Sequence, residues 1–158
     1  MTGRISGFFT LSGLYDGVRR LNEELLHYEE HPLPISWIGR AYFDQSEYDE
    51  ARKKFETALK IVQQIGDRAG EAGTFAQLGI MASERGHVEE GLRLVALSAM
   101  ILSSIGHARI KEVEPWVNGL ASQLNYTQEQ FDSMLREVAE SRQRDRSWSL
   151  IEAAFGED

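Results

Sequence analysis

The stretch that decides the fold is WIGRAYFDQSEYDEARKKFETALKIVQQI, Trp37 to Ile65. Its second part has apolar residues three or four positions apart, which places them on one face of a helix, opposite a charged face. These apolar residues are Tyr48, Ala51, Phe55, Ala58, Leu59, Val62 and Ile65. Ser46 followed by Asp49 is close to the capping box that begins many helices, and Thr127 with Gln130 fits that pattern at the corresponding place in the third unit. The pattern therefore predicts an amphipathic helix over 48–65 that packs on neighbouring helices.

Similar residues recur at intervals of forty positions. The markers of this repeat are Gly39, Gly79 and Gly119, and the pairs Ile65-Gly66 and Ile105-Gly106. Repeats of this length are typical of stacked helix pairs. A glycine inside a helix costs about 1 kcal/mol relative to alanine, so we expect the three marker glycines to lie where two helices approach closely. Ala51 and Gly91 are small at equivalent positions of the second helix of each pair, whereas Phe131 in the third unit is large.

The motif spacings of one repeat family occur in WIGRAYFDQSEYDEARKKFETAL, residues 37–59, and more weakly in FAQLGIMASERGHVEEGLRLVALSA, residues 75–99. On these residues the chain resembles the tetratricopeptide repeat family over 35–106. The usual period is about 34 residues, and the longer period here resembles the extended variant of kinesin light chains and of bacterial sensor and adaptor proteins. The linker GDRAGEAG, 66–73, looks like the junction of that variant, in which Asp67 would cap a lengthened helix. The resemblance implies an all-α fold, a right-handed superhelix of antiparallel helix pairs with helical caps.

We expect a single domain, 1–158, made of successive helical units. These are a packing helix over 11–31, repeat 1 over 32–66, repeat 2 over 67–106, a degenerate repeat 3 over 107–145 and a capping helix over 146–156. In the third unit Asn118 replaces an aliphatic residue, and we expect Pro115 to interrupt or start the first helix. In the last segment one helical face carries Trp148, Ile151, Ala154 and Phe155. We expect that face to cover the last repeat.

Composition narrows the class of protein. The chain has 158 residues, 42% of them hydrophobic and 27% charged, with three prolines, which argues against a disordered or fibrous chain. The net charge of -8 repels a phosphate backbone, so we expect no nucleic acid partner. The chain has no cysteine, which removes disulfides and thiol catalysis. No apolar run approaches the roughly 20 residues of a membrane span, and we expect a cytoplasmic protein with no membrane partner.

The most enzyme-like stretch is HYEEHP, His27 to Pro32, which has the H-x-x-E-H spacing of a zinc peptidase motif. On a helix His27 and His31 would share a face and hold one zinc ion, with Glu30 activating a water molecule. Pro32 and Pro34 end the helix directly after His31, and no third ligand is evident. The histidines more simply serve the last helical turn. We therefore expect no metal, no cofactor and no catalytic residue, with a zinc hydrolase as a remote alternative.

A basic stretch near the end, REVAESRQRDRSW, is the other candidate for a charged site. Its arginines are Arg136, Arg142, Arg144 and Arg146, and its interrupting acidic residues are Glu137, Glu140 and Asp145. Aromatic residues are not interleaved, so the footprint of a nucleic acid site is missing. We interpret the stretch as a solvated helix end, with an acidic partner surface as the other interpretation.

The resemblance also implies a binding groove, because the first helix of each pair lines the concave face of such arrays. The corresponding residues are Ser36, Arg40, Phe43 and Asp44 in repeat 1, Ala76, Ile80, Ser83 and Glu84 in repeat 2, and Trp116, Leu120 and Gln123 in repeat 3. The family's best-known peptide clamp uses Lys and Asn where this chain has Ser36 and Arg40, then Ala76 and Ile80. That departure argues against capture of an acidic C-terminal carboxylate. In the alternative interpretation Phe43 and Trp116 are covered by the terminal helices and belong to the core.

Together these observations predict a non-catalytic module that binds a protein or peptide, as an adaptor or a regulatory domain. Apolar groove side chains would supply affinity, and Arg40, Asp44 and Glu84 would fix orientation. The acidic surface favours a basic or amphipathic partner. The main alternative is a structural or self-assembling protein, a homodimer formed through the C-terminal helix with Trp148 and Phe155.

Overall fold

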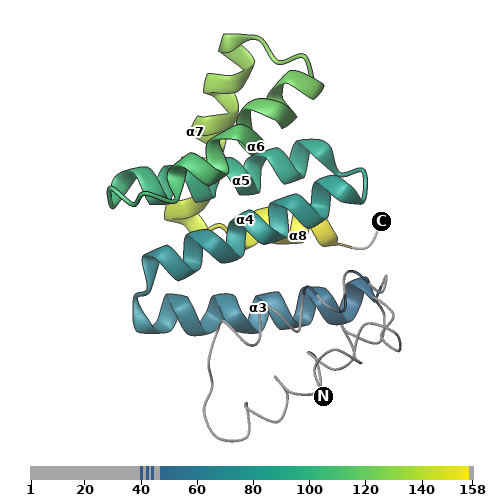
Figure 1. The fold of residues 1–158 in the computed structure, drawn as a ribbon, viewed down its shortest axis with the longest axis vertical. Coiled ribbons are helices and arrows are strands. Elements are labelled where there is room, and N and C mark those ends of the chain that lie inside the picture. Colours follow the sequence, from purple (N-terminus) through teal and green to yellow (C-terminus); the bar gives the residue numbers. More distant parts are fainter. Residues whose placement is uncertain (1–39, 41, 43, 45–46, 157–158) are drawn as a thin grey trace, which may run out of the picture. The chain divides into compact units, whose positions relative to one another are not determined.

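The computed structural model describes residues 40, 42, 44 and 47–156, and every regular element within them is an α-helix. The helices are α3 (Tyr48–Ile65), α4 (Arg68–Glu84), α5 (Val88–Ser104), α6 (Ile110–Gln123), α7 (Gln128–Asp145) and α8 (Trp148–Phe155) (Figure 1). The chain divides into two compact units, Met1–Ile65 and Gly66–Asp158. The all-α, helical-repeat fold class expected from the sequence is confirmed.

In the first unit, α3 has the amphipathic character predicted for 48–65. The buried residues are Ala51, Phe55, Ala58, Leu59 and Val62. On the polar face Arg52 donates to Glu56 at 2.9 Å, one helical turn away. Ile65 departs from the prediction, because it is exposed rather than part of the buried face. It is the last residue of the helix, and Gly66, with a φ of +76°, turns the chain directly after it.

In the second unit, α4 and α5 form an antiparallel pair with their backbones in contact (Figure 1). A Cβ atom added to Gly79 would lie 2.8 Å from the carbonyl oxygen of Gly91, and one added to Gly91 would lie 2.6 Å from the carbonyl oxygen of Gly79. Carbon and oxygen atoms that are not bonded do not pack that closely, so a side chain at either position would push the helices apart. The close helix approach predicted for Gly79 and Gly91 is confirmed.

The next two helices are arranged more openly. Both α6 and α7 pack on α5, but they do not run alongside one another as α4 and α5 do (Figure 1). No heavy atom lies within 4 Å of a Cβ added to Gly119. The expectation that Gly119 marks a close helix crossing is therefore wrong. Phe131 stands where the earlier pair has a small residue, and it lines a hollow with Asn118 and Ala121 of α6.

Pro115 lies inside α6, which continues without interruption from Ile110 to Gln123. The expectation that this proline interrupts or starts the helix is wrong. A proline has no N–H, so the carbonyl of Lys111 loses its helical partner. Lys111 is exposed, so a water molecule is able to donate a hydrogen bond to that carbonyl instead.

Two predicted helix caps are present. Asp67 accepts a hydrogen bond from the backbone N–H of Gly70 at 2.8 Å and so begins α4. Thr127 and Gln130 form a reciprocal capping box at the start of α7, with bonds of 3.2 and 2.9 Å. The third cap, at Ser46, lies outside the described residues.

The chain reverses after α7 through two consecutive residues in the left-handed region, Arg146 and Ser147, with φ of 56° and 69°. As a result α8 packs on α5 and α4 as well as on α7 (Figure 1). Its buried residues are Leu150, Ile151, Ala154 and Phe155. The helix thus covers the preceding pair of helices in addition to the last one, which the sequence pattern did not indicate.

Candidate partner-binding surfaces

One side of α6 is packed and the other is bare. Val113, Val117 and Leu120 recur every three or four residues and are buried on the side that packs on α5. Trp116, in contrast, exposes 42% of its surface. A hollow of about 320 Å³ lies along this bare side, lined by Pro115, Trp116, Gly119, Leu120 and Gln123. The structure therefore brings together the three groove residues predicted for the third repeat, Trp116, Leu120 and Gln123.

The groove residues predicted on α4 have mixed environments. Ala76 is buried, Ile80 and Ser83 are half-buried, and Glu84 is exposed at the end of the helix. The Ser83 hydroxyl donates to the carbonyl of Ile80 at 2.8 Å, so it is already satisfied within the helix. Ala76 therefore belongs to the core. The alternative interpretation, which placed Phe43 and Trp116 in the core, is wrong for Trp116, which is exposed, and Phe43 lies outside the described residues.

In the first unit two of the predicted groove residues are described. Arg40 and Asp44 form an ion pair of 3.2 Å, one helical turn apart. Ser36 and Phe43 lie outside the described residues. The two charges expected to orient a partner thus compensate each other in the free protein.

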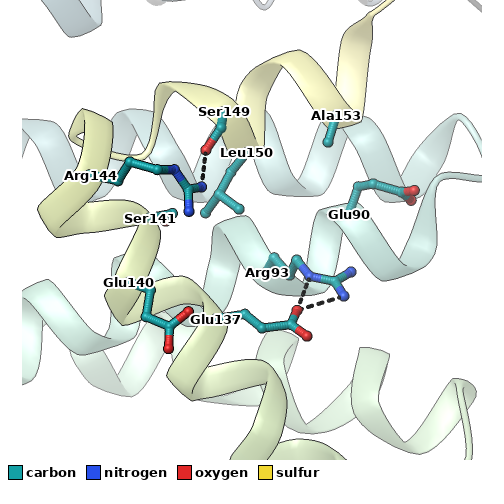
Figure 2. A pocket seen from close by; sticks show the side chains of 9 residues that line it. All are labelled: Glu90, Arg93, Glu137, Glu140, Ser141, Arg144, Ser149, Leu150 and Ala153. Atoms are coloured by element: carbon teal, nitrogen blue, oxygen red, sulfur yellow. Dashed lines mark hydrogen bonds and ion pairs between the residues drawn. The ribbon is translucent and has the colours of Figure 1, made fainter.

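A second hollow, which we call the α5–α7–α8 cleft, was not indicated by the sequence. It has a volume of about 360 Å³ and is lined by Glu90, Arg93, Glu137, Glu140, Ser141, Arg144, Ser149, Leu150 and Ala153 (Figure 2). Leu150 and Ala153 of α8 supply an apolar wall, and the charged side chains come from α5 and α7. The resemblance directed attention to the first helix of each pair, whereas this cleft is built from second helices and the terminal helix.

Arg93 holds the α5 side of the cleft to α7. It forms an ion pair with Glu137 at 3.1 Å (Figure 2). It forms another with Glu89 at 3.2 Å. Partial burial alone would lower the pKa of Arg93, but the hydrogen bond and charge of Glu137, with those of Glu89, outweigh it and raise that pKa. Tyr126 donates to Glu89 at 3.1 Å, and burial together with this carboxylate raises the pKa of the tyrosine. Arg93 is therefore a fixed cation, already engaged by its own carboxylates.

Arg144 holds the α7 side of the cleft to α8. Its guanidinium donates to the Ser149 hydroxyl at 3.1 Å (Figure 2). It also lies 3.5 Å from the Asp145 carboxylate. Burial alone would raise the pKa of Asp145, but hydrogen bonds from Ser149 and the charge of Arg144 outweigh it and lower that pKa. The contacts that hold Arg144 at the junction of α7 and α8 thus come from Asp145 and Ser149, which are close to it in sequence.

Arg142 is not a solvated helix-end residue, contrary to our interpretation of the basic stretch. It donates two hydrogen bonds to the carboxylate of Glu71 at the start of α4, one of them at 2.8 Å. Glu71 is 4% exposed, so the pair is largely shielded from water. The partners are 71 residues apart in sequence, and no local pattern could have joined them. Arg136 and Arg146 are exposed, as the interpretation expected.

The HYEEHP stretch, considered as a zinc site in the sequence, lies outside the described residues. Among residues 40, 42, 44 and 47–156 no group of three His, Cys, Asp or Glu side chains is placed to hold a metal ion. His107 accepts the backbone N–H of Arg109 at 3.1 Å and so serves a turn. Within the same residues no helix is long and apolar enough to cross a membrane.

The apolar face of α8, which the sequence offered for a homodimer, is largely occupied within the chain. Ile151, Ala154 and Phe155 are buried, and Trp148 is half-buried. Because this helix packs on α4, α5 and α7, little of that face is left for a second molecule.

Comparison with known proteins gives one match. Residues 33–94 match the family model named tetratricopeptide repeat. The matched range begins before α3 and ends within α5, and it lies almost wholly inside the 35–106 stretch that carries the sequence resemblance. No curated protein and no solved structure matches the chain. Over residues 33–94 the chain is therefore similar to tetratricopeptide repeats, a class of module that generally binds other proteins and is generally non-catalytic.

Proposed function

We propose that this protein is a non-catalytic adaptor or regulatory module that binds a basic or amphipathic segment of another protein, with the α5–α7–α8 cleft as a contact surface. The observation that carries the proposal is a pair of free carboxylates. Glu90 of α5 and Glu140 of α7 line the cleft and form no hydrogen bond or ion pair with any described residue. Leu150 and Ala153 of α8 add apolar surface to one side of the cleft, and the ion pair of Arg93 with Glu137 lies between the two carboxylates (Figure 2).

This combination suits a lysine or arginine side chain of a partner. Such side chains lay an aliphatic stem along apolar surface and keep the charged end at a polar rim. A charged donor bound by a carboxylate forms one of the stronger hydrogen bonds available in proteins. Arg93 and Arg144 already have acceptors of their own, and the net charge of -8 attracts a basic segment from a distance.

The groove predicted from the sequence stays part of the proposal as a second contact region. On α4 its support is the accessible part of Ile80 and Ser83 and the exposed carboxylate of Glu84. A cytoplasmic location is also proposed, as the sequence analysis expects.

The proposal is tested by titrating the protein with a labelled amphipathic Lys/Leu peptide and following fluorescence anisotropy. Glu90→Gln/Glu140→Gln should weaken binding by roughly 3- to 10-fold, since an exposed ion pair contributes up to about 1 kcal/mol. The matched control is Glu129→Gln/Glu152→Gln, which makes the same charge change at exposed glutamates outside the cleft. Equal weakening in both double variants would show that net charge alone attracts the peptide, and the assignment of the cleft would then be wrong. Absence of binding to the wild type would equally contradict it.

A further inference from the structure

Each free carboxylate of the α5–α7–α8 cleft has an arginine one helical turn further along its own helix. Glu90 precedes Arg93 by three residues on α5, and Glu140 precedes Arg144 by four residues on α7. At these spacings a glutamate and an arginine on one helix readily form an ion pair. Neither pair forms in the described part of the chain, because both arginines are turned toward other acceptors (Figure 2). The two carboxylates are therefore free only as long as those acceptors hold the arginines away.

The two arginines are not held equally firmly. Arg93 has two carboxylates as acceptors, one on its own helix and one on α7. Arg144 has one neutral acceptor, the Ser149 hydroxyl at 3.1 Å, and a longer contact of 3.5 Å with the carboxylate of Asp145. Adjacent residues of a helix do not face each other, so Asp145 alone is a poor anchor. Because the Arg144 side chain is 62% exposed and has room to turn, its position depends mainly on Ser149.

We infer that Ser149 is a positioning residue of the cleft, whose hydroxyl holds Arg144 away from Glu140 and so keeps that carboxylate available to a basic side chain of the partner. Without this hydrogen bond, Arg144 turns back along α7 and pairs with Glu140, and the cleft then contains its own competitor for the partner's cation. The inference rests on the proposed function and deepens it, because it names the contact that decides whether the second carboxylate is available.

The turn between α7 and α8 brings Ser149 to Arg144. Arg146 and Ser147 both lie in the left-handed region, with φ of 56° and 69°, and they reverse the chain within two residues. Ser149 follows as the second residue of α8 and lies beside the Arg144 guanidinium (Figure 2). Residues other than glycine adopt the left-handed conformation at a cost, and they keep it where surrounding contacts hold them. The docking of α8 and the availability of Glu140 are thus linked through one side chain.

The first experiment needs no partner and measures how free Glu140 is. Carboxylates are labelled with a water-soluble carbodiimide and glycinamide, and tandem mass spectrometry gives the rate at Glu140 relative to that at the exposed Glu129 of the same helix. In Ser149→Ala this relative rate should fall about two- to three-fold, because an exposed pair at this spacing forms roughly half of the time or more. Ser149→Thr retains the hydroxyl and should label like the wild type. Arg144→Gln/Ser149→Ala should regain the wild-type rate, because the competing arginine is gone.

The second experiment repeats the peptide titration of the proposed function. Ser149→Ala should weaken binding of the labelled Lys/Leu peptide about two-fold, and Arg144→Gln/Ser149→Ala should restore it. Arg136→Gln/Ser149→Ala is the matched control, since it makes the same change in net charge at an exposed arginine of α7 outside the cleft. It should bind the peptide more weakly than Arg144→Gln/Ser149→Ala. A merely structural role of Ser149 predicts no such difference, and circular dichroism melts check that each variant is folded.

An unchanged labelling rate at Glu140 in Ser149→Ala, or equal peptide binding by the two double variants, would overturn the inference. A wild type that does not bind the peptide would instead contradict the proposed function. In that case the labelling experiment still decides whether Ser149 holds Arg144 away from Glu140.

Discussion

The ion pair between Arg142 and Glu71 ties the end of α7 to the start of α4, and Arg142→Met tests how much it stabilises the fold. Glu71 is 4% exposed, so removing the arginine leaves a buried carboxylate without its cation. Breaking a buried pair in this way typically costs about 3–5 kcal/mol. The Arg142 side chain is 28% exposed, and water replaces part of the lost interaction. We therefore expect the free energy of unfolding to fall by about 2–3 kcal/mol.

The measurement is urea unfolding followed by far-UV circular dichroism, and in a thermal melt the same loss corresponds to a decrease in Tm of about 5–10 °C. Arg136→Met is the matched control, because Arg136 lies on the same helix, is exposed and has no described partner. It should change the free energy of unfolding by less than about 0.5 kcal/mol. Glu71→Leu/Arg142→Met should recover most of the lost stability, because no buried charge remains. If Arg142→Met behaves like Arg136→Met, the pair is not shielded and the reasoning is wrong.

Three further predictions concern single side chains. Gly79→Ala should destabilise the protein by more than about 2 kcal/mol because its Cβ would meet the Gly91 carbonyl. Gly119→Ala should instead stabilise it by up to about 1 kcal/mol. Thermal melts that rank the two variants the other way would contradict the packing described for α4 to α7. Thr127→Ala removes the capping box of α7 and should cost about 1 kcal/mol in a urea titration, and an unchanged midpoint would show that the cap contributes nothing. The lowered pKa of Asp145 means that its stabilising contribution is present above the ordinary pKa and is lost as pH falls through the folded value. Asp145→Asn should accordingly flatten the loss of stability below about pH 4, and an acid limb as steep as that of the wild type would refute this.

Local patterns were sufficient for the helices and for several of their ends. The apolar spacing within 48–65 predicted α3, and the capping residues Asp67 and Thr127 act as expected. Apolar spacing and capping both depend on residues within about one turn of a helix, so a short stretch of sequence is enough to predict them. Ile65 fits the apolar spacing but is exposed, because helical periodicity alone does not show which residues of the last turn face solvent.

The candidate surfaces were only partly predictable. Trp116, Leu120 and Gln123 were expected to lie together because they follow one another along a single helix. The α5–α7–α8 cleft was missed, since its two free carboxylates, Glu90 and Glu140, are fifty positions apart and line the same cleft only because α5 and α7 pack together.

The sequence by itself determined that this chain folds as helices, that residues 33–94 are similar to tetratricopeptide repeats, and that Gly79 and Gly91 meet, because these features follow from spacings repeated along the chain. The tertiary structure decided how the third pair departs from that pattern. Phe131, where the earlier pair has Gly91, lines a hollow with Asn118 and Ala121, and Gly119 faces open space instead of a neighbouring helix. The left-handed residues Arg146 and Ser147 then turn α8 back, and the pair of Arg142 with Glu71 holds that end of the chain against α4. Interactions between residues this far apart depend on where whole helices settle, and that is decided by the packing of all of them together.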